Sequence, residues 1–301
     1  MIRGKICVVT GGGSGIGQAL CEELVRSGAS GVYIVDKCRE SAQQVSASLP
    51  SLATHHHRQS NNDKNFQCGL SVADIGKEED IRRVIHEAWE LFGRIDVFFS
   101  NAGIMTMGGI HDVSNEMWDK IWKINVMSHV FAARHLFPLW RRQKQYNNGA
   151  GESNDVGNID RDDVPNNGVF VITASAAGML MQIGSLPYHV TKHAAVSVAD
   201  WLAVHHHDDG VRVHCICPQA VQTNLLSSNA SPFIRHVAEL DGVITPRDVA
   251  IKTIEAIERE EFCVLPHPEV KKYFERKASD YDRWLKGMRR VHRHFFSPSK
   301  L

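Results

Sequence analysis

The sequence lacks the features that mark membrane, secreted and nucleic-acid-binding proteins. No apolar run among the 301 residues is long enough to cross a bilayer, and the first residues lead into a strand pattern without a cleavable signal. The 34 Lys and Arg balance the 34 Asp and Glu, so no broad basic surface is expected to hold a nucleic acid or an anionic membrane. We expect a soluble protein of a reducing compartment that binds a small molecule.

Metal-binding and disulfide patterns are also missing. The seven cysteines are scattered through apparent strands and helices, which favours buried free thiols. The 17 histidines include triplets at 55–57 and 205–207, but consecutive residues cannot share one helix face, and no acidic or thiol ligand recurs at metal spacing. We expect no metal site.

Short apolar runs alternate with longer amphipathic stretches along the chain. With 43% hydrophobic residues the chain can bury a large core, and the alternation is typical of a parallel sheet covered by helices on both faces. We expect a single α/β domain with a doubly wound, seven-stranded parallel sheet in a Rossmann-like, three-layer α/β/α arrangement. Strands are predicted at 5–10, 32–36, 66–70, 95–100, 169–173, 211–216 and 262–265, and helices at 15–28, 38–49, 77–92, 115–144, 188–207 and 246–260.

Three segments interrupt or extend this alternation. Residues 50–65 and 146–167 are rich in Asn, Asp, Ser, Gly and His, which predicts surface insertions within one domain. Residues 268–294 have the pattern of an amphipathic helix, whose basic residues are expected to form a solvated face. We expect this extension to pack on the core or on a neighbouring subunit, with a lid over the substrate as the alternative.

A glycine-rich turn follows the first predicted strand and precedes the first predicted helix. Glycines let the backbone turn tightly and approach a pyrophosphate, whose charge is stabilised by the free N–H groups and the dipole of the helix start. The position between a strand and a helix makes this assignment more specific than the glycines alone. The turn is Thr10-Gly11-Gly12-Gly13-Ser14-Gly15-Ile16-Gly17.

Asp36 ends the second predicted strand, about twenty residues after the turn. A carboxylate at this position can accept hydrogen bonds from both hydroxyls of an adenosine ribose, and it repels the 2′-phosphate of NADP. Ser14 adds no positive charge inside the turn, whereas the neighbouring cation of Lys37 softens the repulsion. We predict NAD as the cofactor, against the alternative that Asp36 only caps the next helix.

Tyr188 and Lys192 are four residues apart in a predicted helix, so they lie on the same helix face. Ser175 follows the fifth predicted strand, where an α/β sheet exposes polar groups to its crevice. Alcohol oxidation removes a proton from the oxygen, and a tyrosine with a pKa of about 10 is a poor base near neutral pH unless cations favour its phenolate. We predict Tyr188 as the acid/base and Lys192 as the cation that lowers its pKa.

The glycine turn and the tyrosine–lysine pair together resemble the short-chain dehydrogenase/reductase family, over residues 4 to about 266. The resemblance implies that Lys192 also binds the nicotinamide ribose, that Ser175 holds the substrate oxygen, and that Asn125 holds a proton-relay water. It further implies cofactor contacts from Asp74-Ile75 or, in another alignment, Ser71-Val72, and from Asn101-Ala102-Gly103, Pro218, Val221 and Thr223.

Loops beyond the strand ends should contact the substrate. The loops 104–107, 179–186 and 225–237 are rich in Met, Leu, Ile and Phe, which indicates an apolar or lipid-like alcohol or ketone. Gln219 stands where the family usually has glycine, a departure that bears on the local backbone and on the substrate mouth. The resemblance also implies a homodimer or homotetramer formed through the helices 115–144 and 188–207.

The last three residues, Ser299-Lys300-Leu301, have the sequence of a peroxisomal address. Pro298 and the polar residues around it should keep this tail extended and available to a receptor. We predict import into peroxisomes through the receptor that binds the tripeptide, and a cytoplasmic protein if the tripeptide is not recognised.

Two other functions compete with the enzymatic one. A regulatory protein could sense NAD(H) with the same fold and catalyse nothing, although the joint presence of Ser175, Tyr188, Lys192 and Asn125 argues against it. A structural interaction protein could act through residues 268–301 alone. The favoured prediction is an oxidoreductase that transfers a hydride between NAD(H) and an alcohol or ketone.

Overall fold

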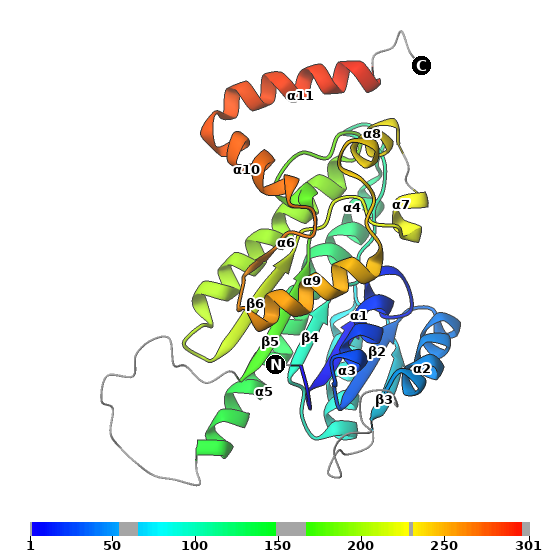
Figure 1. Cartoon of the computed structure of the whole chain (residues 1–301), viewed down its shortest axis with the longest axis vertical. Coiled ribbons are helices and arrows are strands. Elements are labelled where there is room, and N and C mark those ends of the chain that lie inside the picture. Colours follow the sequence, from blue (N-terminus) through cyan, green and yellow to red (C-terminus); the bar gives the residue numbers. More distant parts are fainter. Residues whose placement is uncertain (1, 54–65, 149–166, 229–230, 297–301) are drawn as a thin grey trace.

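The computed structural model describes residues 2–53, 66–148, 167–228 and 231–296 (Figure 1). Their strands form one seven-stranded sheet in the order β3-β2-β1-β4-β5-β6-β7, and every neighbouring pair is parallel. The predicted doubly wound sheet is therefore confirmed. The strands are β1 (Ile6–Thr10), β2 (Gly31–Asp36), β3 (Gln67–Val72), β4 (Val97–Ser100), β5 (Gly168–Thr173), β6 (Val211–Ile216) and β7 (Cys263–Val264).

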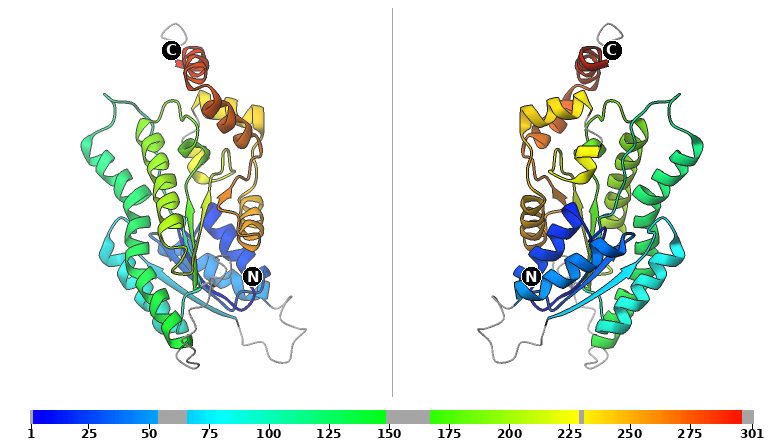
Figure 2. Two further views of the ribbon diagram at one scale, coloured as in Figure 1. Left: turned by 90° about the vertical axis from the view of Figure 1, so that its left-hand side faces the viewer. Right: turned by 90° about the vertical axis from the view of Figure 1, so that its right-hand side faces the viewer.

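Helices cover both faces of the sheet, which gives the three layers seen in Figure 2. Neighbouring strand residues point to opposite faces, so Val9 enters one hydrophobic core and Val8 the other. Because both faces are buried, the strands are apolar almost throughout. The first layer holds α1 (Gly15–Arg26), α2 (Arg39–Ala53) and α9 (Pro246–Glu258), and the second holds α3 (Glu78–Phe92), α5 (Ser128–Asn148) and α6 (Leu186–His205).

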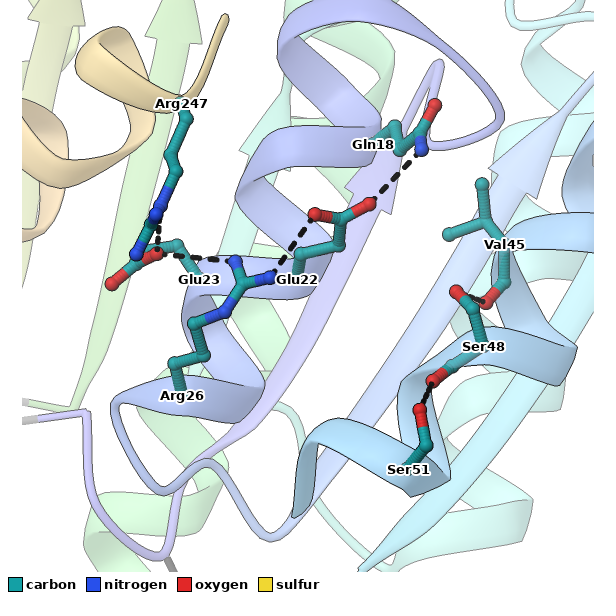
Figure 3. A network of polar contacts seen from close by, with 8 residues as sticks. All are labelled: Gln18, Glu22, Glu23, Arg26, Val45, Ser48, Ser51 and Arg247. Carbon is teal, nitrogen blue, oxygen red and sulfur yellow. Dashed lines mark hydrogen bonds and ion pairs between the residues drawn. The ribbon is translucent and has the colours of Figure 1, made fainter. Parts of the chain in front are cut away.

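Charged contacts connect the outer surfaces of α1 and α9. Figure 3 shows Glu23 accepting from Arg26 of its own helix at 3.3 Å and from Arg247 of α9 at 3.5 Å. Such partly exposed pairs stabilise a fold only weakly. The packing of α1 on α9 therefore rests on buried apolar residues such as Leu24 and Ile254.

The long helix predicted at 115–144 is interrupted. It consists of α4 (Asn115–Trp122), a π-helical turn η2 (Lys123–Met127) and then α5, which continues to Asn148. The first predicted insertion also begins later than expected, because α2 runs through Pro50 to Ala53. Pro50 lies in the last turn of α2, where a missing N–H removes a single helical hydrogen bond. The remainder of both predicted insertions lies outside the described residues.

The C-terminal extension is two helices rather than one. α10 (Glu269–Ser279) ends at Asp280, whose backbone is extended, and α11 (Tyr281–Phe296) continues in a new direction. Two short helices that the sequence pattern did not predict, α7 (Asn224–Ser228) and α8 (Pro232–Asp241), lie on the same end of the molecule (Figure 1). Among the described residues, no helix combines the length and apolarity needed to span a membrane.

Candidate active site

The candidate site is a pocket at the carboxyl ends of the strands. The sheet order reverses between β1 and β4, and the connections after these two strands leave in opposite directions and open a crevice. Of the predicted catalytic and cofactor residues, leaving aside the alternative pair Ser71-Val72, Asn125 alone does not line this pocket, and its side chain is fully buried. The others are Gly11, Ser14, Gly15, Ile16, Gly17, Asp36, Asp74, Ile75, Asn101, Ala102, Gly103, Ser175, Tyr188, Lys192, Pro218, Val221 and Thr223.

The glycine turn forms a close backbone approach between β1 and α1. A side chain at Gly17 would place its Cβ 2.0 Å from the Gly11 carbonyl oxygen, so only glycine fits there. Gly11 and Gly15 have φ values of +68° and +54°, which side chains rarely adopt. The turn thus brings bare backbone and the N-terminus of α1 to the pocket, the arrangement that suits a pyrophosphate. The residues present fit a dinucleotide.

Asp36 lies beside this turn at the end of β2. Its carboxylate accepts hydrogen bonds from the backbone N–H of Gly13 at 2.9 Å and of Cys38 at 3.0 Å. The two bonds fix the orientation of the side chain, which still lines the pocket. The alternative of a simple helix cap explains the bond to Cys38, but the bond to Gly13 joins Asp36 to the cradle itself.

Asp74 and Ile75 line the pocket, whereas the alternative pair Ser71 and Val72 does not. Ser71 and Val72 belong to β3, and Ser71 is buried and accepts a hydrogen bond from Arg83. Asp74 lies beyond the strand in a turn that its own carboxylate closes, through a bond from the Gly76 N–H at 3.0 Å. The structure therefore favours the Asp74-Ile75 alignment.

Asn101 connects the strands next to the point where the strand order reverses, between β1 and β4. Its amide nitrogen donates to the Thr10 carbonyl at 2.9 Å, and its amide oxygen accepts from Thr173 Oγ1 at 3.0 Å. Thr10 Oγ1 in turn accepts from the backbone N–H of Asn101 and of Ala102. These bonds link the ends of β1, β4 and β5, so the floor of the pocket is held at a fixed width.

Asn125 lies in the π-helical turn behind the pocket, and all of its side-chain contacts are internal. Its amide accepts from the Ile104 N–H at 2.9 Å and donates to the Ile104 carbonyl at 2.9 Å and to Thr191 Oγ1 at 3.1 Å. The Asn125 side chain bonds to both the N–H and the C=O of Ile104, as a neighbouring strand would, and so holds the segment that follows β4. A relay water on Asn125 would have to use the main-chain carbonyl, and this role stays a prediction.

Tyr188, Lys192 and Ser175 meet on the other side of the pocket. Tyr188 and Lys192 are one turn apart on α6, and the Lys192 ammonium lies 5.6 Å from the centre of the Tyr188 ring. Lys192 Nζ donates to the Thr173 carbonyl at 2.9 Å, and Ser175 Oγ donates to the Pro218 carbonyl at 3.3 Å. Both side chains are therefore anchored to the ends of β5 and β6.

Burial controls the ionisation of this group. It raises the pKa of Tyr188, and a hydrogen bond with Ser175 offsets only part of that rise. Burial also lowers the pKa of Lys192 to about 8. The pKa of Tyr188 therefore lies above its usual value in the protein alone, because a buried phenolate loses its hydration. The lowering expected from Lys192 together with an oxidised nicotinamide stays a prediction. The phenolate needs further positive charge in the pocket.

Gln219 fits its position without backbone strain, since it is not among the residues with positive φ. Its backbone N–H donates to His267 Nδ1 at 3.2 Å, and its side chain donates to Asp241 at the end of α8 at 3.0 Å. Asp241 also accepts from Tyr273 of α10 at 2.8 Å. The residue that replaces the family's glycine therefore ties the strand end to α8 and to the C-terminal extension.

The end of the pocket away from the glycine turn is mainly apolar, and some of the apolar loop residues predicted to contact the substrate line it. Met105, Leu225, Leu226 and Phe233 line it, whereas Met107, Met179, Leu180, Met181 and Ile183 do not, and Leu180 and Ile183 belong to the core. α10 holds the start of the loop that carries the pocket residue Gln182, because Lys277 Nζ donates to the Met179 carbonyl at 2.7 Å.

Sequence reasoning missed several polar residues near the site, among them Thr173 and Asn224, which line the pocket. Gln182 lines the pocket, and its loop position gave no signal beyond its polarity. His129 is completely buried below the π-helical turn, with Nδ1 2.6 Å from Ser100 Oγ and with Nε2 unpartnered. Burial lowers the pKa of His129 to about 3, so it is neutral. Its position four residues after Asn125 on one helix face was the available clue.

No group of three or more His, Cys, Asp or Glu side chains is placed to hold a metal ion within the parts of the chain that the structure describes. All seven cysteines are free thiols, and Cys215 and Cys217 lie with their sulfurs 3.8 Å apart.

Comparison with known proteins agrees with this geometry. The family model described as short chain dehydrogenase matches residues 5–147 and 163–232. The CLA biosynthesis dehydrogenase/reductase of Lactiplantibacillus plantarum is 28% identical over 289 residues, 89% of each chain. The meso-2,3-butanediol dehydrogenase of Serratia marcescens is 27% identical over 73% of each chain. A crystal structure of a short-chain dehydrogenase/reductase from Burkholderia phymatum in complex with NAD superimposes with a TM-score of 0.74, at 23% identity, over 93% of this chain and 95% of that one.

Proposed function

Since the chain belongs to the short-chain dehydrogenase/reductase family, we propose that it transfers a hydride between NAD(H) and an apolar, lipid-like alcohol or ketone. Membership makes it an oxidoreductase that acts on alcohol or ketone groups with a nicotinamide dinucleotide. The observation that carries the finer proposal is the convergence of Tyr188, Ser175 and Lys192 on the pocket that also contains the glycine turn and Asp36.

The proton chemistry falls to Tyr188. Its hydroxyl is buried in the pocket wall and in hydrogen-bond contact with Ser175, so a substrate oxygen placed between the two would be held and deprotonated there. A bound nicotinamide dinucleotide in its oxidised form supplies the hydride acceptor and a positive charge. Lys192 adds its own charge on the same helix face and is held by the Thr173 carbonyl until it binds a ribose. Asn125 keeps its predicted role in the relay to solvent.

NAD rather than NADP is favoured by the charges at the adenosine end. The Asp36 carboxylate lines the pocket in a fixed orientation, and a second negative group beside it would be repelled. Lys37 also lines the pocket and softens this preference. Adenine and ribose would lie between Asp36 and the Asp74-Ile75 turn, and the nicotinamide end would lie at Pro218, Val221 and Thr223.

The substrate class follows from the far end of the pocket. Met105, Leu225, Leu226 and Phe233 offer apolar surface, and no charged residue lies among them. Such a lining stabilises a hydrocarbon and gives no partner to a charged group.

A homodimer or homotetramer is proposed through α4–α5 and α6. The outer face of α6 exposes Val190, Trp201 and Val204, and Trp122 at the end of α4 is also exposed. Exposed apolar residues repeated along one helix face are typical of a protein interface. Light scattering on the purified protein tests the assembly.

Peroxisomal import is proposed from Ser299-Lys300-Leu301, which lies outside the described residues. A fluorescent reporter that ends in these residues should collect in peroxisomes, and one without Leu301 should not. A reporter that stays diffuse in the cytosol with the intact tail would refute the proposal and leave a cytoplasmic protein.

The decisive experiment compares the wild type with Tyr188→Phe on a panel of aliphatic alcohols and ketones, followed by NADH absorbance. We expect turnover in the wild type and a loss of several orders of magnitude in kcat for the variant, with NADH affinity retained. Tight NADH binding without any turnover in the wild type would favour the sensor function instead. Loss of function on removal of residues 268–301, with cofactor affinity intact, would favour the interaction protein.

A further inference from the structure

The C-terminal extension is positively charged, although the charges of the whole chain balance. Residues 268–296 contain nine Lys and Arg and four Asp and Glu, so this segment has a net charge of +5 and the rest of the chain −5. The expectation that no broad basic surface exists rests on the balance of the whole chain, and that balance does not describe this segment. A molecule polarised in this way turns its basic end toward an anionic surface.

Arg283, Lys286, Arg290 and Arg293 form a stripe along α11. Their spacings of three, four and three residues place them on one helix face, over a length of about 15 Å. All four are exposed, and among the described residues none of them has a carboxylate within ion-pair distance. The stripe therefore keeps its charge available for a partner.

The opposite face of α11 is apolar and holds the helix on the molecule. The Phe295 ring lies 6.3 Å from Phe233 of α8 and 4.8 Å from His236. At the other end of α11, Trp284 packs with Leu180 and Val270. With this face turned inward, the basic stripe faces outward, and Figures 1 and 2 place α11 at the extreme end of the molecule.

One exposed aromatic side chain belongs to the same C-terminal extension. Phe274 of α10 is 41% exposed, whereas Tyr281 lies on the face of α11 opposite the stripe, with its ring centre 5.6 Å from Lys277 Nζ. Aromatic residues next to Lys and Arg are typical of surfaces that rest at the headgroup level of a bilayer. The apolar end of the pocket opens at the same end of the molecule, because Phe233 both lines the pocket and touches α11. A lipid surface matches this combination better than a nucleic acid, for which the apolar pocket has no use.

We propose that α10 and α11 dock the protein on membranes with anionic phospholipid headgroups. The basic stripe would contact the headgroups, and the exposed Phe274 would enter the interface. An apolar alcohol or ketone could then pass from the bilayer to the pocket without crossing water. This last step rests on the proposed function, whereas docking itself does not.

The test is co-sedimentation of the full-length protein with vesicles of phosphatidylcholine alone and of phosphatidylcholine with phosphatidylserine. We expect the protein to pellet with the anionic vesicles only, and to be released by added salt because screening weakens the attraction. Arg290→Glu/Arg293→Glu should lower vesicle affinity by at least about tenfold. The matched control is Arg82→Glu/Arg142→Glu, which makes the same charge change at exposed positions on α3 and α5.

The outcomes separate docking from catalysis. Three results would overturn the proposal. They are pelleting of the protein equally with both kinds of vesicle, pelleting with neither, and pelleting of Arg290→Glu/Arg293→Glu to the same extent as the wild type. Two further results also overturn it. One is release of the protein by inorganic phosphate at an ionic strength at which chloride does not release it, and the other is tighter binding to duplex RNA than to vesicles. NADH binding measured on each variant confirms that the fold is intact. Docking without turnover would remove the proposed function and keep this inference.

Discussion

The preference for NAD over NADP can be estimated from the Asp36 carboxylate. A 2′-phosphate on the ribose would lie close to this carboxylate, and two unit charges about 4 Å apart repel by about 1 kcal/mol in bulk water and about 4 kcal/mol near a protein surface. The dissociation constant of NADPH should therefore exceed that of NADH by a factor between about five and about a thousand.

Asp36→Asn removes the charge and keeps the shape. The amide still offers one oxygen, so one of the two backbone donors, Gly13 or Cys38, loses its acceptor, at a cost in stability of about 1 kcal/mol or slightly more. NADH and NADPH affinities are measured by fluorescence titration of the wild type and the variant. We expect the ratio of the two dissociation constants to fall toward unity in Asp36→Asn.

Lys37→Ala is the matched control for this prediction. Loss of the cation should widen the preference for NADH, because Lys37 offsets part of the repulsion. A wild type that binds both cofactors within about twofold would refute the electrostatic argument, as would an unchanged ratio in Asp36→Asn.

Three further predictions concern the framework of the site. Gly17→Ala should abolish NADH binding in the same titration, because its Cβ would lie 2.0 Å from the Gly11 carbonyl oxygen; retained affinity would contradict this. Lys192→Met should stop turnover yet raise the free energy of unfolding at pH 7 by up to about 3 kcal/mol, since the buried ammonium has its pKa lowered to about 8. The buried charge destabilises the fold fully below pH 8, and this destabilisation disappears as the pH rises toward 10.5. If the variant gained the same free energy of unfolding in urea at pH 7 and at pH 10, the reasoning would be disproved. Asn125→Leu should lower the free energy of unfolding by about 2 kcal/mol, because the half-buried N–H and C=O of Ile104 lose their partner; a loss below about 1 kcal/mol would show that the segment finds other bonds.

The doubly wound, seven-stranded parallel sheet could be predicted because strand, turn and helix signals agree locally. Each strand is an apolar run between turn residues, and the glycine turn after the first strand has a fixed structural context. The same local signals placed Tyr188, Lys192 and Asp36 correctly at the pocket. The residue roles stay predictions until the variants are measured.

What the sequence could not predict depends on contacts between distant residues. The π-helical turn at 123–127 accompanies the bonds from Asn125 to Ile104 and Thr191, which no helical periodicity reports. The pKa of Tyr188 in the protein alone depends on burial by neighbours from several elements, which its spacing from Lys192 does not report. The short helix α8 was missed because ten residues carry little periodic signal.

The bonds from Tyr273 and Lys277 to residues 241 and 179 have a consequence for biosynthesis. The glycine turn and Asp36 precede Tyr273 and Lys277 by more than 200 residues. During synthesis, residues 179 and 241 therefore stay without these two partners until long after the glycine turn has left the ribosome. A chain that stops before Glu269 would lack both bonds.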